Sequence, residues 1–390
     1  MIRHLLFLIW NKKKAHTLLI TEIWASFLVL FGISSLIIYN VSHYAEPIGF
    51  TYDNVWTVSL NNNQDTVAVA QKVQAIQQRL KGYPAVESVA RMGDNAPFSN
   101  YQNSMGVSYN NIKTQVASYN TDENFAKTLA IPLTAGTWYR AADSVAKYRP
   151  VIINQKAVET MFGNDNPVGK VISDHDGKTT RWRVAGVINT FKARGEFMKN
   201  EPAMFELLDD KDGTNKTMII RVKSGTDAFF ESKLVKDITS MTPGWSVDVN
   251  YLTDARETQH NITLVPIIIF LIVSGFLLIN VALGLFGVLN VSIARRRGEI
   301  GLRRALGATE GSISRQFVGE MWVLATFALV LGLLLAGQFP LMNVFDLDAG
   351  VYLMAMAASV LIIYLLVTLC AVFPSRQAAT VQPAVALHEE

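Results

Sequence analysis

The chain has 390 residues, half of them hydrophobic and 17% of them charged, and its formal net charge is +3. This length suggests two or three folding units, and the apolar share is high for a wholly soluble protein. The positive charge comes from the basic residues beside the apolar runs and reflects membrane topology rather than nucleic-acid binding, and the single cysteine, Cys370, excludes a disulfide within the chain.

The first ten residues place apolar side chains at helical spacing. Ile2, Leu5, Leu6 and Ile9 share one helical face, and the basic residues Lys12–Lys14 follow. The pattern fits a short amphipathic helix on the inner membrane surface. It fits the first turns of a long membrane helix equally well, and both interpretations stay open.

Four apolar runs follow along the chain. They are Thr17–Tyr39, Thr263–Asn290, Met321–Leu341 and Val351–Phe373. Each has about 20 residues or more with almost no charge, enough for a helix across a ~30 Å hydrocarbon core. The first run is too long for a signal-peptide core and no small-residue cleavage site follows it, so we expect it to be retained.

Several polar and small residues stand within these runs. Glu22, early in the first run, is expected to extend toward the interface, with a proton relay as the alternative. Five glycines predict close helix packing in a bundle or dimer. They are Gly275, Gly284, Gly287, Gly332 and Gly337.

Basic residues predict the orientation. Lys and Arg cluster before the first run and between the second and third, Arg376 follows the fourth, and the link between the third and fourth has none. By the positive-inside rule, both termini and the loop after the second run face the cytoplasm. Residues 41–261 then lie outside, with 24 basic and 24 acidic residues.

The outer segment alternates strand and helix patterns. The expected strands are Val55–Leu60, Val86–Met92, Val151–Asn154, Lys170–Ser173, Arg181–Asn189, Thr217–Lys223 and Trp245–Leu252, with a hairpin around Asn110-Asn111. The expected helices run from Val69 to Leu80, Glu123–Ala130, Gln155–Phe162 and Ala228–Thr239. This is an α+β domain in two lobes. Asp254 and Glu257 suggest a capping box opening a helix that continues into the second span.

A basic stretch, Arg295–Thr309, separates the second and third runs. Gly298 is expected to interrupt the helix that leaves the membrane, and Glu299–Leu306 can make two helical turns. Gly307 suits a C-terminal stop, and Thr309 can cap the next helix. The pattern predicts a short docking helix, although a solvated loop that sets topology and binds anionic lipid is the alternative.

No catalytic constellation emerges. Gly177-Lys178-Thr179 resembles the end of a phosphate-binding loop, but Ile172 stands where that loop needs its first glycine. Asp174-His175-Asp176 has no further His or Cys nearby and is better explained as a polar turn. We therefore predict no catalytic, cofactor or metal site in this chain.

The stretch Arg297–Thr309, with the sequence RGEIGLRRALGAT, resembles the signature of MacB/FtsX-type permeases of ABC transporters. Weaker landmarks occur in matching order along almost the whole chain. They are Asn124-Phe125 with Ala135-Gly136, Phe162-Gly163 with Pro167–Lys170, Trp182–Ile188, and Pro374–Ala379 with Pro383–Leu387.

The resemblance implies an integral membrane α-helical protein with four transmembrane helices and a large α+β extracytoplasmic domain of two lobes. Its expected parts are an N-terminal segment with span 1 (1–40), a MacB-like periplasmic domain (41–261), span 2 (262–292), a coupling-helix loop (293–316), span 3 (317–342), a short outer loop (343–350), span 4 (351–373) and a cytoplasmic tail (374–390).

The resemblance also implies partners. Glu299, Ile300, Leu302, Arg303, Arg304, Leu306 and Gly307 are expected to contact a cytoplasmic ABC ATPase dimer, which would hold ATP and magnesium because this chain has no Walker motif. A second permease subunit, membrane lipid, and a periplasmic adaptor, outer-membrane channel or lipoprotein complete the expected set, with no nucleic acid.

The expected function is non-enzymatic. ATP-driven motion would pass to the periplasmic domain for export, efflux or extraction, with the chain in the bacterial inner membrane. The alternative is an FtsX-like regulator that transmits the motion to a cell-wall hydrolase or a sensor.

Overall fold

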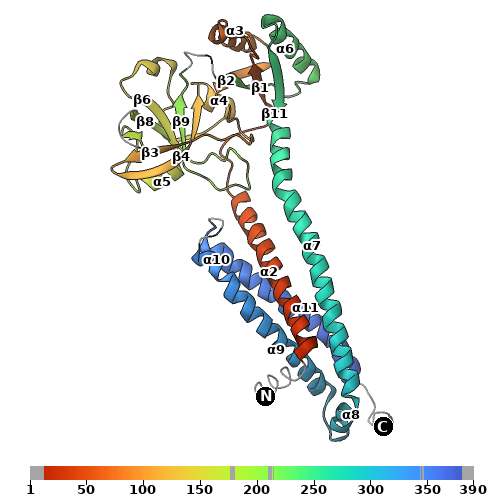
Figure 1. Cartoon of the computed structure of the whole chain (residues 1–390). Helices are drawn as coiled ribbons and strands as arrows, with labels where there is room; N and C mark the ends of the chain where they lie inside the picture. Colours follow the sequence, from red (N-terminus) through yellow and green to blue (C-terminus); the bar gives the residue numbers. More distant parts are fainter. Residues whose placement is uncertain are drawn as a thin grey trace. The chain divides into compact units, whose positions relative to one another are not determined.

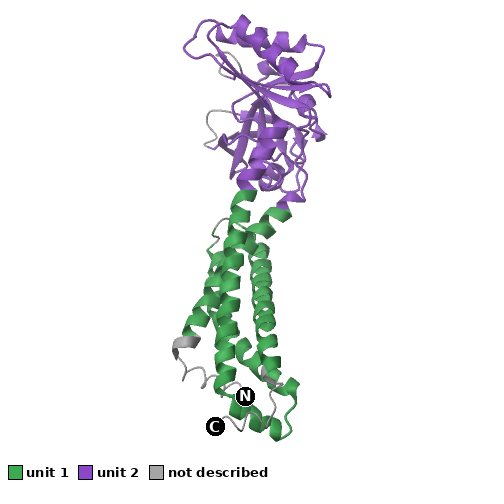
Figure 2. Cartoon of the chain, turned by 90° about the vertical axis from the view of Figure 1, so that its right-hand side faces the viewer, with its two compact units in different colours: residues 1–42, 264–390 green, residues 43–263 purple. Residues whose placement is uncertain are grey.

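The computed structural model describes residues 13–175, 181–209, 213, 215–342, 344 and 347–379 (Figure 1). It forms two compact units, which Figure 2 shows in different colours. Unit 1 comprises residues 1–42 and 264–390, and unit 2 comprises residues 43–263. The expectations for residues 1–10, for Gly177-Lys178-Thr179 and for the tail after residue 379 lie outside the described residues.

Unit 1 is helical. Its helices are α2 (Lys13–Tyr44), α7 (Leu252–Arg295), α8 (Arg297–Ala305), α9 (Glu310–Ala336), α10 (Gln338–Leu341) and α11 (Ala349–Ala379), of which α2 and α7 extend into unit 2. Four of them have segments long and apolar enough to cross a membrane: Thr17–Tyr44, Leu252–Arg295, Glu310–Leu341 and Ala349–Gln377. The four predicted spans are therefore confirmed as apolar helices.

All four long helices contribute to one buried core. Phe27 of α2, Leu285 of α7, Leu324 of α9 and Val367 of α11 belong to it. Within a bilayer such packing depends on close contact, because apolar side chains gain little by leaving lipid. Small residues at the contacts therefore decide how near the helices come.

The predicted glycine contacts are confirmed at only some positions. A Cβ on Gly332 of α9 would lie 2.4 Å from Phe27 Cδ1, so the Phe27 ring needs the space that this glycine leaves. A Cβ on Gly284 of α7 would lie 2.8 Å from Glu22 Oε2 of α2. That oxygen is buried without a hydrogen-bond partner among the described residues. Gly275 and Gly287 have no other atom within 4 Å of that position.

The first lobe of unit 2 is a four-stranded antiparallel sheet with two helices. Its elements are β1 (Val55–Asn61), α3 (Val69–Lys81), β2 (Val86–Met92), β10 (Thr217–Val222), α6 (Ala228–Met241) and β11 (Ser246–Tyr251). The strand order is β11-β1-β10-β2. Figure 1 shows α3 and α6 together, and their apolar faces share a buried core with the strands.

The second lobe is inserted between β2 and β10. Its elements are β3 (Ser104–Tyr109), β4 (Ile112–Thr121), α4 (Phe125–Leu129), β5 (Leu133–Gly136), the 3-10 helix η1 (Ala141–Val145), β6 (Arg149–Asn154), α5 (Gln155–Met161), β7 (Val171–Asp174), β8 (Arg181–Ile188) and β9 (Ala203–Leu207). The strands pair in the order β4-β3-β7-β8-β6-β9, and β9 pairs with β4 again, so the six strands form a closed ring. β5 pairs with β8 outside this order. The two-lobed α+β prediction is confirmed.

The hairpin between β3 and β4 has the predicted turn. Asn110 and Asn111 have φ values of 46° and 67°. Asparagine tolerates this left-handed conformation better than most residues, and two such residues in sequence suit a tight hairpin turn. β5 and β9 were not predicted.

The Gly332 contact gives a stability prediction. Gly332→Ala should lower the melting temperature of the purified chain in detergent, because the new methyl group forces the Phe27 ring to move at a cost of about 1–3 kcal/mol. Gly287→Ala is the matched control, since nothing lies near its Cβ position. Equal melting temperatures for the two variants would contradict the packing described for Gly332.

Candidate functional site

The basic segment turns at Arg296. Helix α7 ends at Arg295, α8 begins at Arg297, and Arg296 between them has φ −114° and ψ 16°. The expectation that Gly298 interrupts the helix is wrong, because Gly298 lies within α8. The prediction of a short helix is confirmed, although it spans Arg297–Ala305 rather than Glu299–Leu306.

The Arg296 side chain explains why the chain turns there. Its Nη1 donates to both carboxylate oxygens of Glu320 in α9 at 3.0 Å, and its Nε donates to Glu299 Oε2 at 3.1 Å. The guanidinium also lies 5.7 Å from the centre of the Phe317 ring. Charged hydrogen bonds of this kind contribute about 1.5–3 kcal/mol when shielded from water. Arg296 thereby joins the start of α8 to α9.

Two further arginines hold α8 against the same helix. Arg303 Nη2 lies 2.6 Å from Glu299 Oε1, one helical turn away. Its Nη1 donates to Gln316 Oε1 in α9 at 2.5 Å. Arg304 Nη2 lies 3.1 Å from Glu310 Oε1, in the first turn of α9. These pairs are more exposed than that of Arg296 with Glu320, so each contributes less.

Gly307 ends α8 as predicted. Its φ of +94° is a left-handed conformation that favours glycine. The Gly307 N–H donates to the Arg304 carbonyl and the Ala308 N–H to the Arg303 carbonyl, both at 3.0 Å, which is the Schellman arrangement. Thr309 then caps α9 as predicted by accepting from the Ser312 N–H at 3.3 Å.

The seven predicted contact residues play four different roles. Ile300 is 4% exposed and belongs to the core of unit 1, so it anchors α8 rather than presenting a surface. Glu299, Arg303 and Arg304 take part in the ion pairs, and Gly307 shapes the turn. Leu302 and Leu306 are 54% and 79% exposed. α8 is therefore a fixed helix with one exposed leucine, Leu302, and a second, Leu306, directly after its last residue.

A second cluster, within unit 2, was not predicted from the sequence. We call it the clasp. It consists of Lys192, Glu196 and Phe197 from the loop between β8 and β9, with His43, Tyr44 and Glu46 at and after the end of α2, and Arg256 and His260 near the start of α7. No sequence motif marks it, because its residues come from three distant segments.

Lys192 forms the α2 side of the clasp. Its side chain is fully buried, and its Nζ donates to the His43 carbonyl at 2.6 Å and lies 3.1 Å from Glu46 Oε2. A buried ammonium needs such partners, because an unpaired charge away from water costs several kcal/mol. The loop is therefore tied to the last turn of α2.

Glu196 forms the α7 side. Its Oε1 accepts from Arg256 Nε at 2.5 Å, and its Oε2 lies 2.7 Å from His260 Nε2. The Phe197 ring packs between Tyr44 and His260, with ring centres 5.2 and 5.0 Å away. One loop thus contacts the chain where it enters unit 2 and where it leaves.

α7 itself begins earlier than expected. It starts at Leu252, so Asp254 and Glu257 lie inside the helix and do not form a capping box at its start. The Thr258 hydroxyl donates to the Asp254 carbonyl at 2.9 Å. The expectation that this helix continues unbroken into the second span is confirmed by its 44 residues.

Four apolar helices, a basic helix between the second and third, and a large two-lobed domain between the first and second define a four-span membrane protein with a large α+β domain. The family model for the MacB-like periplasmic core domain matches residues 25–230, more than half of the chain. That for the FtsX-like permease C-terminal matches residues 271–383. The chain belongs to the MacB/FtsX-type family of ABC transporter permeases.

Similar proteins carry permease names. The uncharacterized ABC transporter permease YknZ of Bacillus subtilis (strain 168) is 24% identical over 260 residues, covering 65% of this chain and 63% of that protein. The macrolide export ATP-binding/permease protein MacB of Hahella chejuensis is 24% identical over 347 residues, covering 84% and 50%. The chain spans between about half and two thirds of the length of these two relatives.

Solved structures with some likeness are outer domains. The periplasmic region of MacB from Actinobacillus actinomycetemcomitans is 14% identical with a TM-score of 0.39, covering 56% of this chain and 98% of that one. The extracellular domain of the transporter YknZ from Gram-positive bacteria is 16% identical with a TM-score of 0.36, covering 50% and 100%.

The Arg296 contacts give a prediction for α8. Arg296→Ala should speed hydrogen exchange of the α8 amides by about 30-fold or more, because it removes charged hydrogen bonds that contribute about 2–3 kcal/mol. Arg295→Ala is the control, since Arg295 is an exposed neighbour at the end of α7. An equal effect of both substitutions would mean that Arg296 does not hold the helix.

The clasp gives a prediction for pH. Burial raises the pKa of Glu196, but hydrogen bonds from His260 and Arg256 outweigh it and hold the pKa below its ordinary value of 4.5. A carboxylate with a lowered pKa stabilises the folded state above its ordinary pKa, and this contribution is lost as the pH falls through the folded value.

Denaturant unfolding of the full chain should therefore show an added loss of stability below about pH 4.5. Glu196→Gln should reduce stability at neutral pH and remove that part of the acid dependence. The exposed Glu159→Gln should leave both unchanged. If the Glu196→Gln variant lost as much stability below about pH 4.5 as the unsubstituted chain, Glu196 would not have this role.

Proposed function

We propose that this chain is a permease subunit that transmits motion from a separate cytoplasmic ATPase to its outer domain. The observation that carries the proposal is the exposure of Leu302 and Leu306 on a helix that is otherwise fixed by buried and charged contacts. Exposed apolar side chains on a basic surface favour a protein partner over water. The proposed partner is the ATPase, which would hold the ATP and magnesium.

The contacts of α8 support a lever rather than a loop. A force applied at Leu302 would reach α9 through Arg296 and Glu320 and reach the core through Ile300. A flexible loop would dissipate the same force in its own backbone. The Schellman turn at Gly307 and the Thr309 cap fix the backbone between the end of α8 and the start of α9.

α7 supports transmission toward the outer domain. It begins at Leu252, directly after β11, and continues as one helix to Arg295. No linker separates the last strand of unit 2 from this helix. Pro266 stands inside α7 and removes one backbone hydrogen bond, which favours a local bend. We propose that α2, α7 and the clasp carry the motion.

The surroundings of the chain follow from the same proposal. Both termini and α8 would face the cytoplasm, and unit 2 would face the periplasm from the inner membrane of a bacterium. α7 has many exposed apolar side chains, among them Ile268, Ile272, Phe276, Ile279 and Leu283. We propose that these meet lipid and a second permease subunit, identical or related, in a dimer.

The role in the cell is proposed as export, efflux or extraction of a periplasmic substrate. Support comes from relatives whose names include macrolide export, although their substrate is not carried over to this chain. A periplasmic adaptor, an outer-membrane channel or a lipoprotein would then receive or supply the substrate.

The test is a double substitution, Leu302→Glu with Leu306→Glu. We expect at least a 10-fold loss of ATPase co-purification and of permease-stimulated ATP hydrolysis in reconstituted membranes, because two carboxylates replace the apolar contact. The control, Val145→Glu with Val171→Glu, places the same charges at exposed positions of unit 2. Unchanged coupling in the first variant would refute the assignment of α8.

A further inference from the structure

α7 is the most exposed of the four apolar helices. In its apolar part 11% of the residues are buried, against 28%, 33% and 39% in the other three. Lipid can cover apolar side chains such as Phe276 and Leu283, which are 65% and 66% exposed. It leaves polar side chains unsatisfied, because the hydrocarbon region offers them no hydrogen-bond partner. Polar groups on the open side of α7 therefore indicate a protein neighbour in the membrane.

One such group is the amide of Asn280. This residue is exposed and lies on the same side of α7 as Phe276, four residues before it, and Leu283, three residues after it. Its Nδ2 donates to the Phe276 carbonyl of the same helix at 2.8 Å. No other described residue bonds the amide. Asn280 thus keeps a free N–H within an apolar run.

The second group is the carboxylate of Glu22 in α2. Its Oε2 is buried and has no hydrogen-bond partner among the described residues. The same oxygen would lie 2.8 Å from a Cβ on Gly284, so the carboxylate faces α7 one helical turn after Asn280. Glu22 as a whole is half-buried, which places it at the edge of the contact between α2 and α7.

The two groups do not satisfy each other within one chain. Side chains on a helix lean toward its N-terminus, and the bond from Asn280 to the Phe276 carbonyl follows this direction. The amide therefore leans away from Gly284 and from Glu22 beside it. A donor and an acceptor are left on neighbouring turns of one surface.

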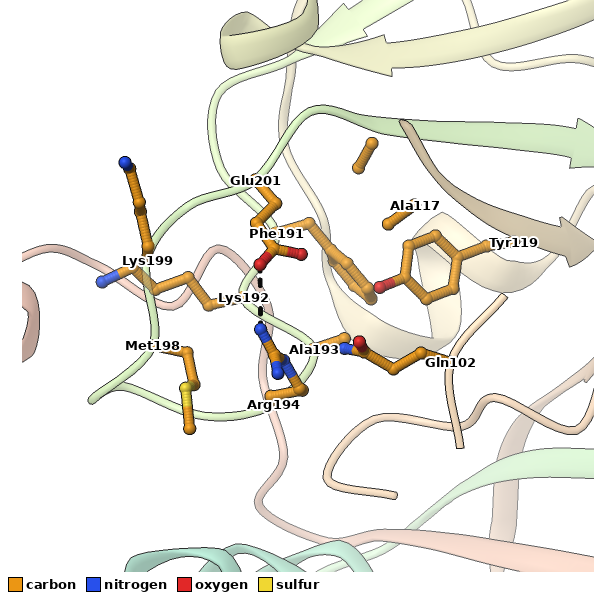
Figure 3. Close-up of a pocket in the computed structure, with 11 residues that line it drawn as sticks. Gln102, Ala117, Tyr119, Phe191, Lys192, Ala193, Arg194, Met198, Lys199 and Glu201 are labelled. Carbon is orange, nitrogen blue, oxygen red and sulfur yellow. Dashed lines mark hydrogen bonds and ion pairs between the residues drawn. The ribbon is translucent and has the colours of Figure 1, made fainter. Parts of the chain in front are cut away.

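In unit 2, by contrast, a comparable acid finds its partner inside the chain. Figure 3 shows the hollow beside the loop between β8 and β9, where Arg194 Nη2 lies 2.8 Å from Glu201 Oε1. That pair is also open to water, which can satisfy either group if the pair separates. Glu22 lies in an apolar helix and has neither a partner of this kind nor the same access to water.

We propose that α7 packs against a second copy of this chain and that Asn280 of each copy donates a hydrogen bond to Glu22 of the other. The contact rests on the dimer of permease subunits proposed above. A two-fold axis normal to the membrane brings each group against its complement at matching depth, so one surface forms two equal contacts. An unrelated membrane protein would need its own matching donor and acceptor.

The contact would also couple the two copies. It joins α2 of one copy to α7 of the other, and both helices extend from unit 1 into unit 2. A movement of α7 in one copy would then be passed to α2 of its partner within the membrane.

The first test is disulfide crosslinking in lipid vesicles, with the full-length chain made free of its own cysteine by Cys370→Ser. Chains with Glu22→Cys and chains with Asn280→Cys are mixed, reconstituted together and oxidised. The mixture should give about 5-fold more crosslinked dimer than either chain alone, because a disulfide needs the two Cα atoms within about 7 Å. The second contact of the same dimer keeps its native pair.

Ile279→Cys in place of Asn280→Cys is the matched control. Ile279 is 60% exposed at the same depth of α7, but it is turned by about 100° around the helix. It should crosslink to Glu22→Cys about 5-fold less than Asn280→Cys does.

The second test is the affinity of the dimer. Dyes attached through Val145→Cys, at a position of unit 2 that is 90% exposed, report dimerisation by energy transfer over a range of protein-to-lipid ratios. Glu22→Leu and Asn280→Leu should each raise the dissociation constant about 5- to 10-fold, since each removes two modest hydrogen bonds. Combining them should weaken the dimer by no more than about 2-fold beyond either alone, because both remove the same contacts.

Two further variants separate this contact from a general loss of polarity. Glu22→Gln keeps an acceptor and should leave the dissociation constant within about 2-fold of that of the unsubstituted chain. Thr326→Val removes an exposed hydroxyl from α9 and should also leave it unchanged.

Equal crosslinking of Asn280→Cys and Ile279→Cys overturns the proposal. Leucine substitutions that leave the affinity unchanged, or whose effects simply add, overturn it as well. A dimer that lacks this crosslink would refute the contact and leave the proposed dimer intact, whereas a chain that stays monomeric at every ratio would refute both. Loss of ATPase coupling in the Leu302 and Leu306 variant tests α8 alone.

Discussion

Arg296 carries three charged hydrogen bonds between two helices of unit 1, and the position of α8 depends on them. Arg296 is the single residue between α7 and α8, and its side chain bonds Glu299 of α8 and Glu320 of α9. These bonds hold the turn between the two helices. With the turn in place, Ile300 can enter the core and Leu302 and Leu306 remain outside. An arginine suits this role because its planar guanidinium can bond several acceptors at once, which an ammonium group cannot do in the same geometry.

In unit 2, the clasp holds two helix ends in place through charged contacts. Lys192 and Glu196 stand four residues apart on one loop, and their charges face opposite neighbours, the end of α2 and the start of α7. The two contacts differ in kind. Lys192 is fully buried and bonds a backbone carbonyl, whereas Glu196 bonds two side chains. The Lys192 contact holds the backbone at the end of α2, and the Glu196 contact is the one expected to weaken in acid.

The elements that could be predicted from the sequence are those with local patterns. Apolar runs of about 20 residues mark the spans, a two-asparagine turn marks the hairpin, and Gly307 and Thr309 mark the ends of α8 and α9. The turn at Arg296 could not be predicted, because its cause is Glu320, 24 residues away. β9 is short and its parallel partner β4 is distant, so no periodicity reveals the closed ring. The clasp combines residues from segments that only the fold brings together.

The direct junction of β11 and α7 affects how the protein is made. β11 pairs with β1, near the start of unit 2, so the four-stranded sheet cannot close until residue 251 has crossed the membrane. The next residues begin the second span, which must then insert. The inserted lobe, by contrast, has all of its ring strands between residues 104 and 207 and can fold while the chain is still emerging. During biogenesis, the inserted lobe can therefore be complete while β1 still lacks its partner strand β11.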